Sequence, residues 1–164
     1  MTLYHSSKTP DIKALKPFPN NGVDGESVVF ATDDKLFAVA MTYGTGDELA
    51  VGYYKDAKSK DVMFIDELDE GKLSLLDNPT SLYEVDSSLF KEDSRLFPGE
   101  FISTTEVPVV KETKIDNVFK YLKRGWVEIT AYKDVPEAME RRKREVDKPE
   151  KEHATNRFDP ANKS

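Results

Sequence analysis

The stretch of sequence that decides the fold class is SVVFATDDKLFAVAM, residues 27–41. Its first five residues form an apolar, β-branched run, which predicts a buried strand at 27–31. Asp33 and Asp34 follow this strand and are suited to cap a helix. Gly44 is suited to end that helix. The apolar residues of the predicted helix recur at three- and four-residue spacing: Leu36, Phe37, Ala40 and Met41.

Short β-prone runs, separated by turn residues, flank this strand and helix. The spacing of apolar residues predicts one more short helix around residues 115–122. The order of elements does not alternate strictly enough for a parallel sheet, so we predict an α+β fold with a mostly antiparallel split sheet and two or three short helices. The runs between 49 and 86 are expected to form an antiparallel meander. Besides the strand at 27–31, the predicted strands are residues 2–5, 49–55, 61–67, 72–76, 81–86, 100–110 and 126–132.

The chain divides by composition into a body and a charged C-terminal part. We predict one compact domain over residues 1–133, which is near the usual size of a domain. We predict that residues 134–147 form a charged helix. This helix is expected to project from the body, because it has few apolar residues to bury. Residues 148–164 are polar and proline-containing, which is typical of a disordered tail.

Composition excludes several classes of function. The chain has no cysteine, so thiol nucleophiles, disulfides and thiolate zinc sites are excluded. A formal net charge of −7 argues against a surface that binds nucleic acid everywhere, although residues 140–145 are locally basic. We expect that basic run to be a solvated helix face or a contact for an acidic partner. With no secretory signal and no long apolar run, we expect a cytoplasmic protein without a membrane-spanning segment.

Few residues stand out as candidates for chemistry. His5 is the only histidine outside the tail, and it is either packed at a strand end or turned toward a cleft. Glu100 begins a predicted strand after Pro98 and Gly99, so its carboxylate is placed to face a pocket. The acidic cluster at residues 66–70 lacks metal-binding spacing, and we expect it to be a solvated turn. We therefore expect no metal site.

A family resemblance connects these residues. The segments LYHSS (3–7), VVFATDDKLFAVAM (28–41) and GEFISTTEVPVV (99–110) resemble three motifs of the ADP-ribosyltransferase-like superfamily, in its histidine–tyrosine–glutamate class. The likeness covers about residues 3–120. It implies an ADP-ribosyltransferase-like fold, with NAD as the cofactor and a protein or nucleic acid as the target, or a related enzyme on the same scaffold that handles a different nucleotide.

The resemblance also implies roles for individual residues. Glu100 would be the catalytic carboxylate that stabilises the oxocarbenium-like transition state. His5 would bind the ribose on the adenosine side of NAD. The remaining residues of the implied cofactor site are Ser6, Ser7, Phe30, Thr32 and Tyr43.

This chain departs from the family pattern at two positions. Val29 stands where the family has a tyrosine on the second strand, with Tyr43 as the candidate for the tyrosine that follows. Ser6 stands where the family has glycine. These departures keep a second hypothesis open, in which the chain is a non-catalytic module that engages a partner through the same cleft or through the 134–147 helix.

Overall fold

The computed structural model describes residues 1–146 and groups their contacts into two compact units. Unit 1 consists of residues 1–42 and 79–118, and unit 2 consists of residues 43–78 and of the described residues from 119 onward. Both units combine antiparallel strand pairs with a helix, so the α+β class with mostly antiparallel sheets is confirmed. The predicted body of residues 1–133 therefore contains all of unit 1 and part of unit 2. The predicted tail at 148–164 lies outside the described residues.

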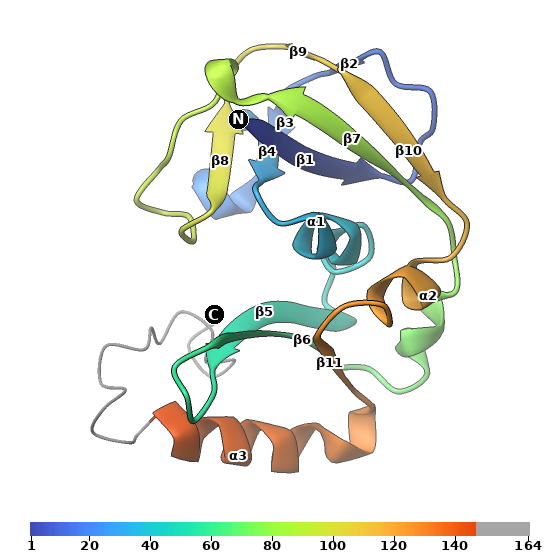
Figure 1. Ribbon diagram of the computed structural model, residues 1–164, viewed down its shortest axis with the longest axis vertical. Coiled ribbons are helices and arrows are strands. Elements are labelled where there is room, and N and C mark those ends of the chain that lie inside the picture. Colours follow the sequence, from blue (N-terminus) through green and yellow to red (C-terminus); the bar gives the residue numbers. More distant parts are fainter. Residues whose placement is uncertain (147–164) are drawn as a thin grey trace. The chain divides into compact units, whose positions relative to one another are not determined.

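Unit 1 is built on an antiparallel six-stranded sheet with the order β10-β7-β1-β4-β3, in which β8 also pairs with β4 (Figure 1). A two-stranded ladder of β2 and β9 accompanies this sheet. The helix α1 (Lys35–Met41) follows β4. The strands of unit 1 are β1 (Thr2–Ser7), β2 (Ala14–Leu15), β3 (Phe18–Pro19), β4 (Ser27–Thr32), β7 (Thr80–Asp86), β8 (Glu100–Ser103), β9 (Val107–Pro108) and β10 (Lys111–Ile115).

The predicted capping of α1 is confirmed. The Asp34 side chain accepts hydrogen bonds from the backbone N–H groups of Leu36 and Phe37, at 2.9 and 3.4 Å. These bonds satisfy donors that the first helical turn leaves without partners. The core of unit 1 is formed by side chains of the sheet strands β1, β4 and β7 together with those of β2 and β9. It consists of Leu3, Leu15, Val29, Ala31, Tyr83, Val85 and Val107.

The long N-terminal loop is tied to the sheet of unit 1. The hydroxyl of Tyr83, on β7, donates to the carbonyl of Thr9 at 2.6 Å and accepts from the N–H of Ile12 at 3.2 Å. The carboxylate of Glu112 accepts from the N–H of Asp11 and from the hydroxyl of Ser81. The loop therefore runs along a fixed path at this edge of the sheet.

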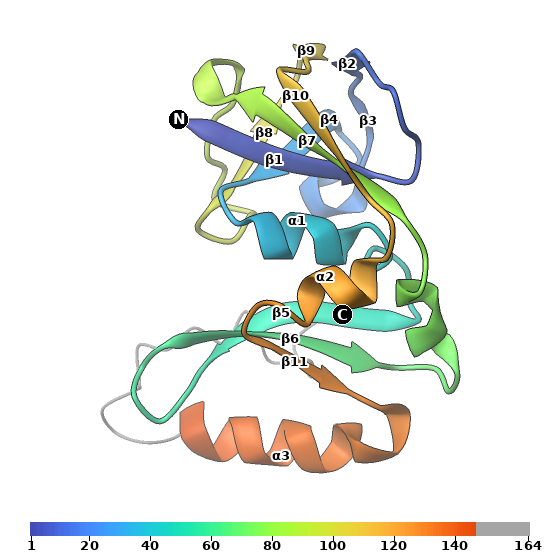
Figure 2. The same cartoon turned by 45° about the vertical axis from the view of Figure 1, so that its right-hand side comes forward.

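Unit 2 is a three-stranded sheet with the order β11-β6-β5, packed against one helix (Figure 2). The strands β5 (Leu49–Lys55) and β6 (Asp61–Glu67) form a hairpin, and β11 (Val127–Thr130) runs parallel to β6. The helix α3 (Val135–Val146) packs against β5. Another short helix, α2 (Val118–Leu122), spans the division between the units. Short 3₁₀ helices complete the described chain: η1 (Asn21–Val23), η2 (Lys72–Leu76), η3 (Ser87–Leu89) and η4 (Tyr132–Asp134).

Several local predictions were wrong. Residues 72–76 form the 3₁₀ helix η2 instead of a strand. The predicted meander is also divided, because β7 pairs with β1 and β10 of unit 1 and not with β6. The predicted strand at 100–110 is two short strands, β8 and β9. Pairing partners distant in sequence decide the last two of these outcomes, and local patterns do not encode them.

The acidic cluster and the basic helix are also placed differently from the prediction. Asp66 and Glu67 are buried residues of β6, not parts of a solvated turn. The helix predicted at 134–147 is α3 (Val135–Val146) in the described residues, and it does not project, because Arg142 is buried against the sheet of unit 2. Within residues 1–146, none of the helices is long and apolar enough to cross a membrane.

Candidate functional site

The candidate site of unit 1 centres on the point where β1 separates from β4. These two strands pair at one position, Tyr4 opposite Thr32. At the next residue the ring of His5 turns to β4, and its Nδ1 lies 2.7 Å from the carbonyl oxygen of Phe30. A side chain thus replaces the backbone pairing that would otherwise continue the ladder.

The hydrogen bond to Phe30 fixes the tautomer of His5. A carbonyl oxygen is only an acceptor, so Nδ1 must carry the proton and donate it. Burial lowers the pKa of His5, and the bond to the Phe30 carbonyl opposes this effect only in part. The ring is therefore neutral near pH 7, and its Nε2 is an acceptor.

Glu100 begins β8, which pairs with β4 as β1 and β3 also do. Its pairing partner is Thr32, so Tyr4, Thr32 and Glu100 form one row across three strands. The ammonium of Lys35 lies 5.3 Å from the centre of the Tyr4 ring, which places a cation beside this row. His5 is one residue beyond the row. The sheet therefore brings His5, Thr32 and Glu100 onto three adjacent strands.

A close contact before Glu100 positions the start of β8. Gly99 has φ +89°, and its carbonyl accepts from the N–H of Asp33 at 3.0 Å. A Cβ atom at Gly99 would lie 2.8 Å from Oδ1 of Asp33. The left-handed conformation favours glycine here, and an added Cβ would force the exposed carboxylate of Asp33 to move.

Replacing Gly99 by alanine is expected to lower the free energy of unfolding by about 1 to 2 kcal/mol, because the left-handed conformation costs roughly that much. Chemical denaturation measures the change. Gly25 is the matched control, since it also has a positive φ but no atom within 4 Å of an added Cβ. If Gly99→Ala loses more free energy of unfolding than Gly25→Ala, the difference is the contribution of the contact with Asp33. Equal losses would contradict a contribution from that contact.

The serines and threonines expected at the cofactor site make internal hydrogen bonds. The hydroxyl of Ser6 donates to the carbonyl of Ala38 in α1 and accepts from the hydroxyl of Thr42 at 2.8 Å. Ser7 accepts from the N–H of Thr9 at 3.1 Å. Thr32 is buried, and its Oγ1 accepts from the N–H of Asp34 at 3.1 Å. Ser6 thus holds β1 to α1, and Thr32 holds the end of β4 to the residue that caps α1.

Two other residues of the predicted site have structural positions. Phe30 contributes its carbonyl to His5, while its ring packs on a small apolar cluster with Val28 and Ile102. Tyr43 belongs to unit 2, so it is not placed relative to His5 or Glu100. Val29, at the position where the family has tyrosine, is 1% exposed and belongs to the core.

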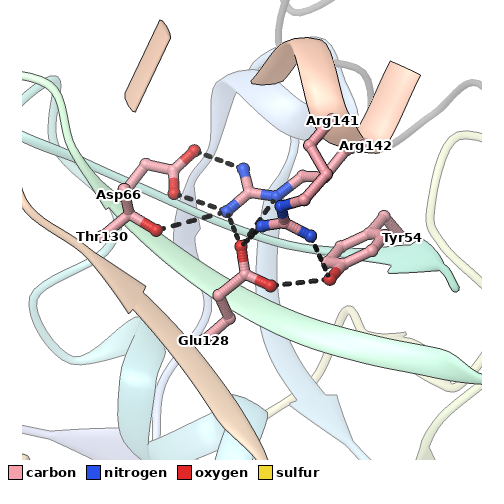
Figure 3. A network of polar contacts seen from close by, with 6 residues as sticks. All are labelled: Tyr54, Asp66, Glu128, Thr130, Arg141 and Arg142. Atoms are coloured by element: carbon pink, nitrogen blue, oxygen red, sulfur yellow. Dashed lines mark hydrogen bonds and ion pairs between the residues drawn. The ribbon is translucent and has the colours of Figure 1, made fainter. Parts of the chain in front are cut away.

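Unit 2 contains a polar network that the sequence analysis did not find (Figure 3). Arg142 donates two hydrogen bonds to Asp66, at 2.6 and 2.9 Å, and a third to Glu128 at 2.7 Å. The side chains of Arg142 and Asp66 are 5% and 0% exposed. The guanidinium also lies 4.3 Å from the centre of the Phe64 ring. This arrangement attaches α3 to the sheet of unit 2.

Neighbouring residues extend the network toward the surface. Tyr54 donates to Glu128 at 2.6 Å and accepts from Arg141 at 3.2 Å, and Arg141 is also paired with Glu128. Burial raises the pKa of Tyr54, so its hydroxyl stays protonated and able to donate. The carboxylates of Asp66 and Glu128 and the hydroxyl of Tyr54 all accept hydrogen bonds within this network. Such mutual pairing is typical of a structural anchor and not of an open binding site.

Glu67 is a second buried carboxylate with a structural role. It accepts from the N–H of Leu73 at 2.7 Å and from that of Tyr132 at 2.8 Å. The bond from Leu73 is the main cause that lowers the pKa of Glu67 below the ordinary value of 4.5, and burial opposes it. The carboxylate thus joins the end of β6 to η2 and η4.

The stability that Glu67 contributes is expected to depend on pH. Its folded-state pKa is lowered, so the contribution is present above pH 4.5 and is lost as the pH falls through the folded-state value. The difference in free energy of unfolding between the wild type and Glu67→Gln should therefore shrink as the pH falls below 4.5. Glu70→Gln is the control, because Glu70 is exposed on the same segment. A difference that stays constant with pH would contradict this role.

Among residues 1–146, no three or more histidine, aspartate or glutamate side chains are grouped as metal ligands. The candidate site of unit 1 contains the neutral imidazole of His5, the carboxylate of Glu100 on a nearby strand and the ammonium of Lys35 over the ring of Tyr4. No family model matches the chain, and neither the curated proteins nor the solved structures contain a significant match to it.

Proposed function

We propose that the protein binds NAD in unit 1 and transfers the ADP-ribose group to a protein or a nucleic acid. The observation that supports this most directly is the hydrogen bond between His5 Nδ1 and the carbonyl of Phe30. It leaves Nε2 of a neutral ring as an acceptor, and a ribose hydroxyl is a suitable donor for it. This agrees with the role that the family resemblance implies for His5.

Glu100 supplies the second part of the proposal. In the reaction, the bond between the ribose C1′ and the nicotinamide nitrogen breaks, and its electron pair leaves with nicotinamide. The carboxylate would accept a hydrogen bond from a ribose hydroxyl and stabilise the positive charge that develops on the ribose. A nucleophile of the target then bonds to C1′ and releases its proton to solvent.

The strand order gives the two residues suitable separate roles. His5 lies on β1 and Glu100 on β8, and both strands pair with β4. Adjacent strands are about 4.8 Å apart, so the two backbones are separated by roughly 10 Å. Side chains alternate between faces along a strand, so His5, one residue beyond the row of Tyr4, Thr32 and Glu100, belongs to the opposite face. A dinucleotide that contacts both residues would therefore have to pass the point where β1 separates from β4.

A non-catalytic binding module is the second candidate function. The internal bonds of Ser6 favour it, because that hydroxyl is engaged with Ala38 and Thr42 and not directed at a ligand. The core position of Val29 favours it as well, since a tyrosine that stacks on nicotinamide is missing from β4. In this alternative, the same cleft or the exposed residues Lys143 and Arg144 of α3 engage a partner.

Ligand binding to the full chain tests the proposal. A ligand that binds only the folded state raises the free energy of unfolding, by about 2.7 kcal/mol at a concentration of 100 times Kd. We expect NAD and ADP-ribose at millimolar concentration to raise the melting temperature, and His5→Gln to reduce this effect. Thr2→Ala is the matched control, because Thr2 is exposed on the same strand and lies outside the implied cofactor site.

The possible results separate the two candidates. No stabilisation by NAD, ADP-ribose or nicotinamide would overturn the nucleotide-binding proposal. Stabilisation by ADP-ribose without release of nicotinamide from NAD, in the presence of candidate protein and RNA acceptors, would favour the binding module.

A further inference from the structure

Trp126 is the most exposed large apolar side chain in the described part of the chain. It is 94% exposed and is the only tryptophan of the sequence. Nothing in the packing of unit 2 accounts for an indole ring in this position. A single exposed apolar residue needs no explanation by itself, so its surroundings decide what it indicates.

Basic side chains surround Trp126. Lys123 and Arg124 come just before it in the sequence, and both are exposed. On the neighbouring strand, the turn between β5 and β6 carries Lys58 and Lys60, which are also exposed. We call Trp126 and these four cations the Trp126 surface.

Strand register brings the two basic segments together. Val127 of β11 is paired with Met63 of β6 in parallel, so Trp126 is level with Val62. The turn residue Lys60 comes two residues before Val62, just before β6 begins, which is about 7 Å along the chain. Figure 2 shows β11 beginning at the end of the sheet that is nearer to the β5–β6 turn. Trp126 therefore lies beside the lysines of that turn.

The acidic residues of this turn do not cancel the charge. Asp61 is paired with Lys55 at 2.8 Å. Asp56 accepts the backbone N–H groups of Lys58 and Lys60 at 2.8 and 3.0 Å. Four cations against one further carboxylate leave this surface positive in a chain whose net charge is −7. Such a local contrast indicates a binding site for an anion.

We propose that the Trp126 surface binds single-stranded nucleic acid, with an unpaired base stacked on the indole and phosphates beside the four cations. An exposed aromatic ring among basic side chains is a combination that such ligands use, the ring for stacking and the cations for phosphates. A base inside a duplex is already stacked on its neighbours and is unavailable to the ring. This proposal concerns unit 2 and does not depend on NAD binding in unit 1.

The surroundings of Trp126 favour nucleic acid over a membrane. Insertion into a lipid surface relies on several apolar side chains along one face. The exposed neighbours of Trp126 are instead charged: Lys58, Lys60, Lys123 and Arg124. Stacking on one base needs only the single ring.

The single tryptophan makes the test direct. The full chain is titrated with 12-nucleotide oligo(dT) and oligo(rU), and the fluorescence of Trp126 is recorded. We expect saturable quenching, an affinity that falls as salt concentration rises, and weaker binding of a duplex of the same length. Comparison of the two oligonucleotides shows whether DNA or RNA is preferred.

Variants are measured by fluorescence anisotropy of a labelled oligonucleotide. Trp126→Ala is expected to weaken binding about tenfold, and Trp126→Phe less, because phenylalanine retains a ring for stacking. Lys123→Ala combined with Arg124→Ala should weaken binding and reduce its salt dependence. Lys133→Ala, an exposed lysine elsewhere in unit 2, is the control and should have no effect.

Several outcomes would overturn the proposal. One is the absence of quenching by either oligonucleotide. A second is binding that Trp126→Ala leaves unchanged, since that would be general attraction to charge. A third is equal affinity for the duplex. A blue shift of Trp126 fluorescence with anionic lipid vesicles, without a response to oligonucleotides, would assign the surface to membranes instead.

Discussion

Replacing Arg142 by alanine is expected to lower the free energy of unfolding of unit 2 by about 3 to 5 kcal/mol, the usual cost of removing one partner from a buried ion pair. The variant leaves the carboxylate of Asp66 buried without its guanidinium partner. It also removes one of the donors to Glu128. A buried charge without a partner has lost its hydration and gained nothing in exchange.

The neighbouring residue on α3 provides the control. Lys143 is exposed, so Lys143→Ala should change the free energy of unfolding by no more than about 0.5 kcal/mol. Urea unfolding followed by far-ultraviolet circular dichroism measures both variants. Hydrogen exchange of β5, β6 and β11 shows whether the loss is confined to unit 2.

A double variant distinguishes the burial of charge from the loss of packing. Arg142→Met combined with Asp66→Leu removes both charges and keeps apolar volume, so it is expected to lose less stability than Arg142→Ala alone. If Arg142→Ala remained within 1 kcal/mol of the wild type, or if the double variant were the less stable of the two, the network would not be the anchor of α3.

This network shows why the behaviour of the C-terminal helix could not be predicted from its sequence. Apolar periodicity predicts burial only for apolar residues, and the basic run at 140–145 therefore indicates a solvated face. Arg142 is buried because Asp66 and Glu128, far away in sequence, come to lie next to it on β6 and β11. Such a pairing depends on the assembled sheet, and no local pattern encodes it.

Elements specified by neighbouring residues were predicted well. The bounds of β5 and β6 agree with the predicted strands at 49–55 and 61–67, because turn residues enclose each apolar run. The cap of α1 at Asp34 is also local, since its acceptor and donors are three residues apart or fewer.

The segment at 72–76 shows the opposite case. Its alternating leucines favour a strand, but Gly71 precedes it in a left-handed conformation with φ +87°. The buried carboxylate of Glu67 then accepts the N–H of Leu73. That hydrogen bond stabilises the 3₁₀ conformation of η2. The sequence alone does not show that the Glu67 side chain lies next to the N–H of Leu73.

The candidate site combines both kinds of information. The sequence identifies His5 and Glu100 as residues of interest, through their positions at strand ends and through the family resemblance. The strand order then adds that both residues lie on strands next to β4. The tautomer of His5 follows from the carbonyl of Phe30, which no sequence pattern shows.

Glu100→Gln is expected to reduce ADP-ribosyl transfer by about 10²- to 10³-fold, the usual effect of removing one group that stabilises transition-state charge. Glutamine keeps the size of the side chain and can still meet a ribose hydroxyl, but it lacks the negative charge that opposes the developing cation. Affinity for ADP-ribose should therefore change much less than turnover. Release of nicotinamide from NAD measures the first quantity, and calorimetry measures the second.

The control for Glu100→Gln is Glu106→Gln, since Glu106 is exposed and lies in the same segment after β8. It should leave both turnover and affinity unchanged. A catalytic carboxylate requires turnover to fall while the melting temperature and the affinity for ADP-ribose stay near those of the wild type. Equal losses in both variants would point to a general effect of charge, and unchanged turnover in Glu100→Gln would remove this residue from the site. A fall in affinity equal to the fall in turnover would make Glu100 a residue that binds the nucleotide and not one that acts on the transition state.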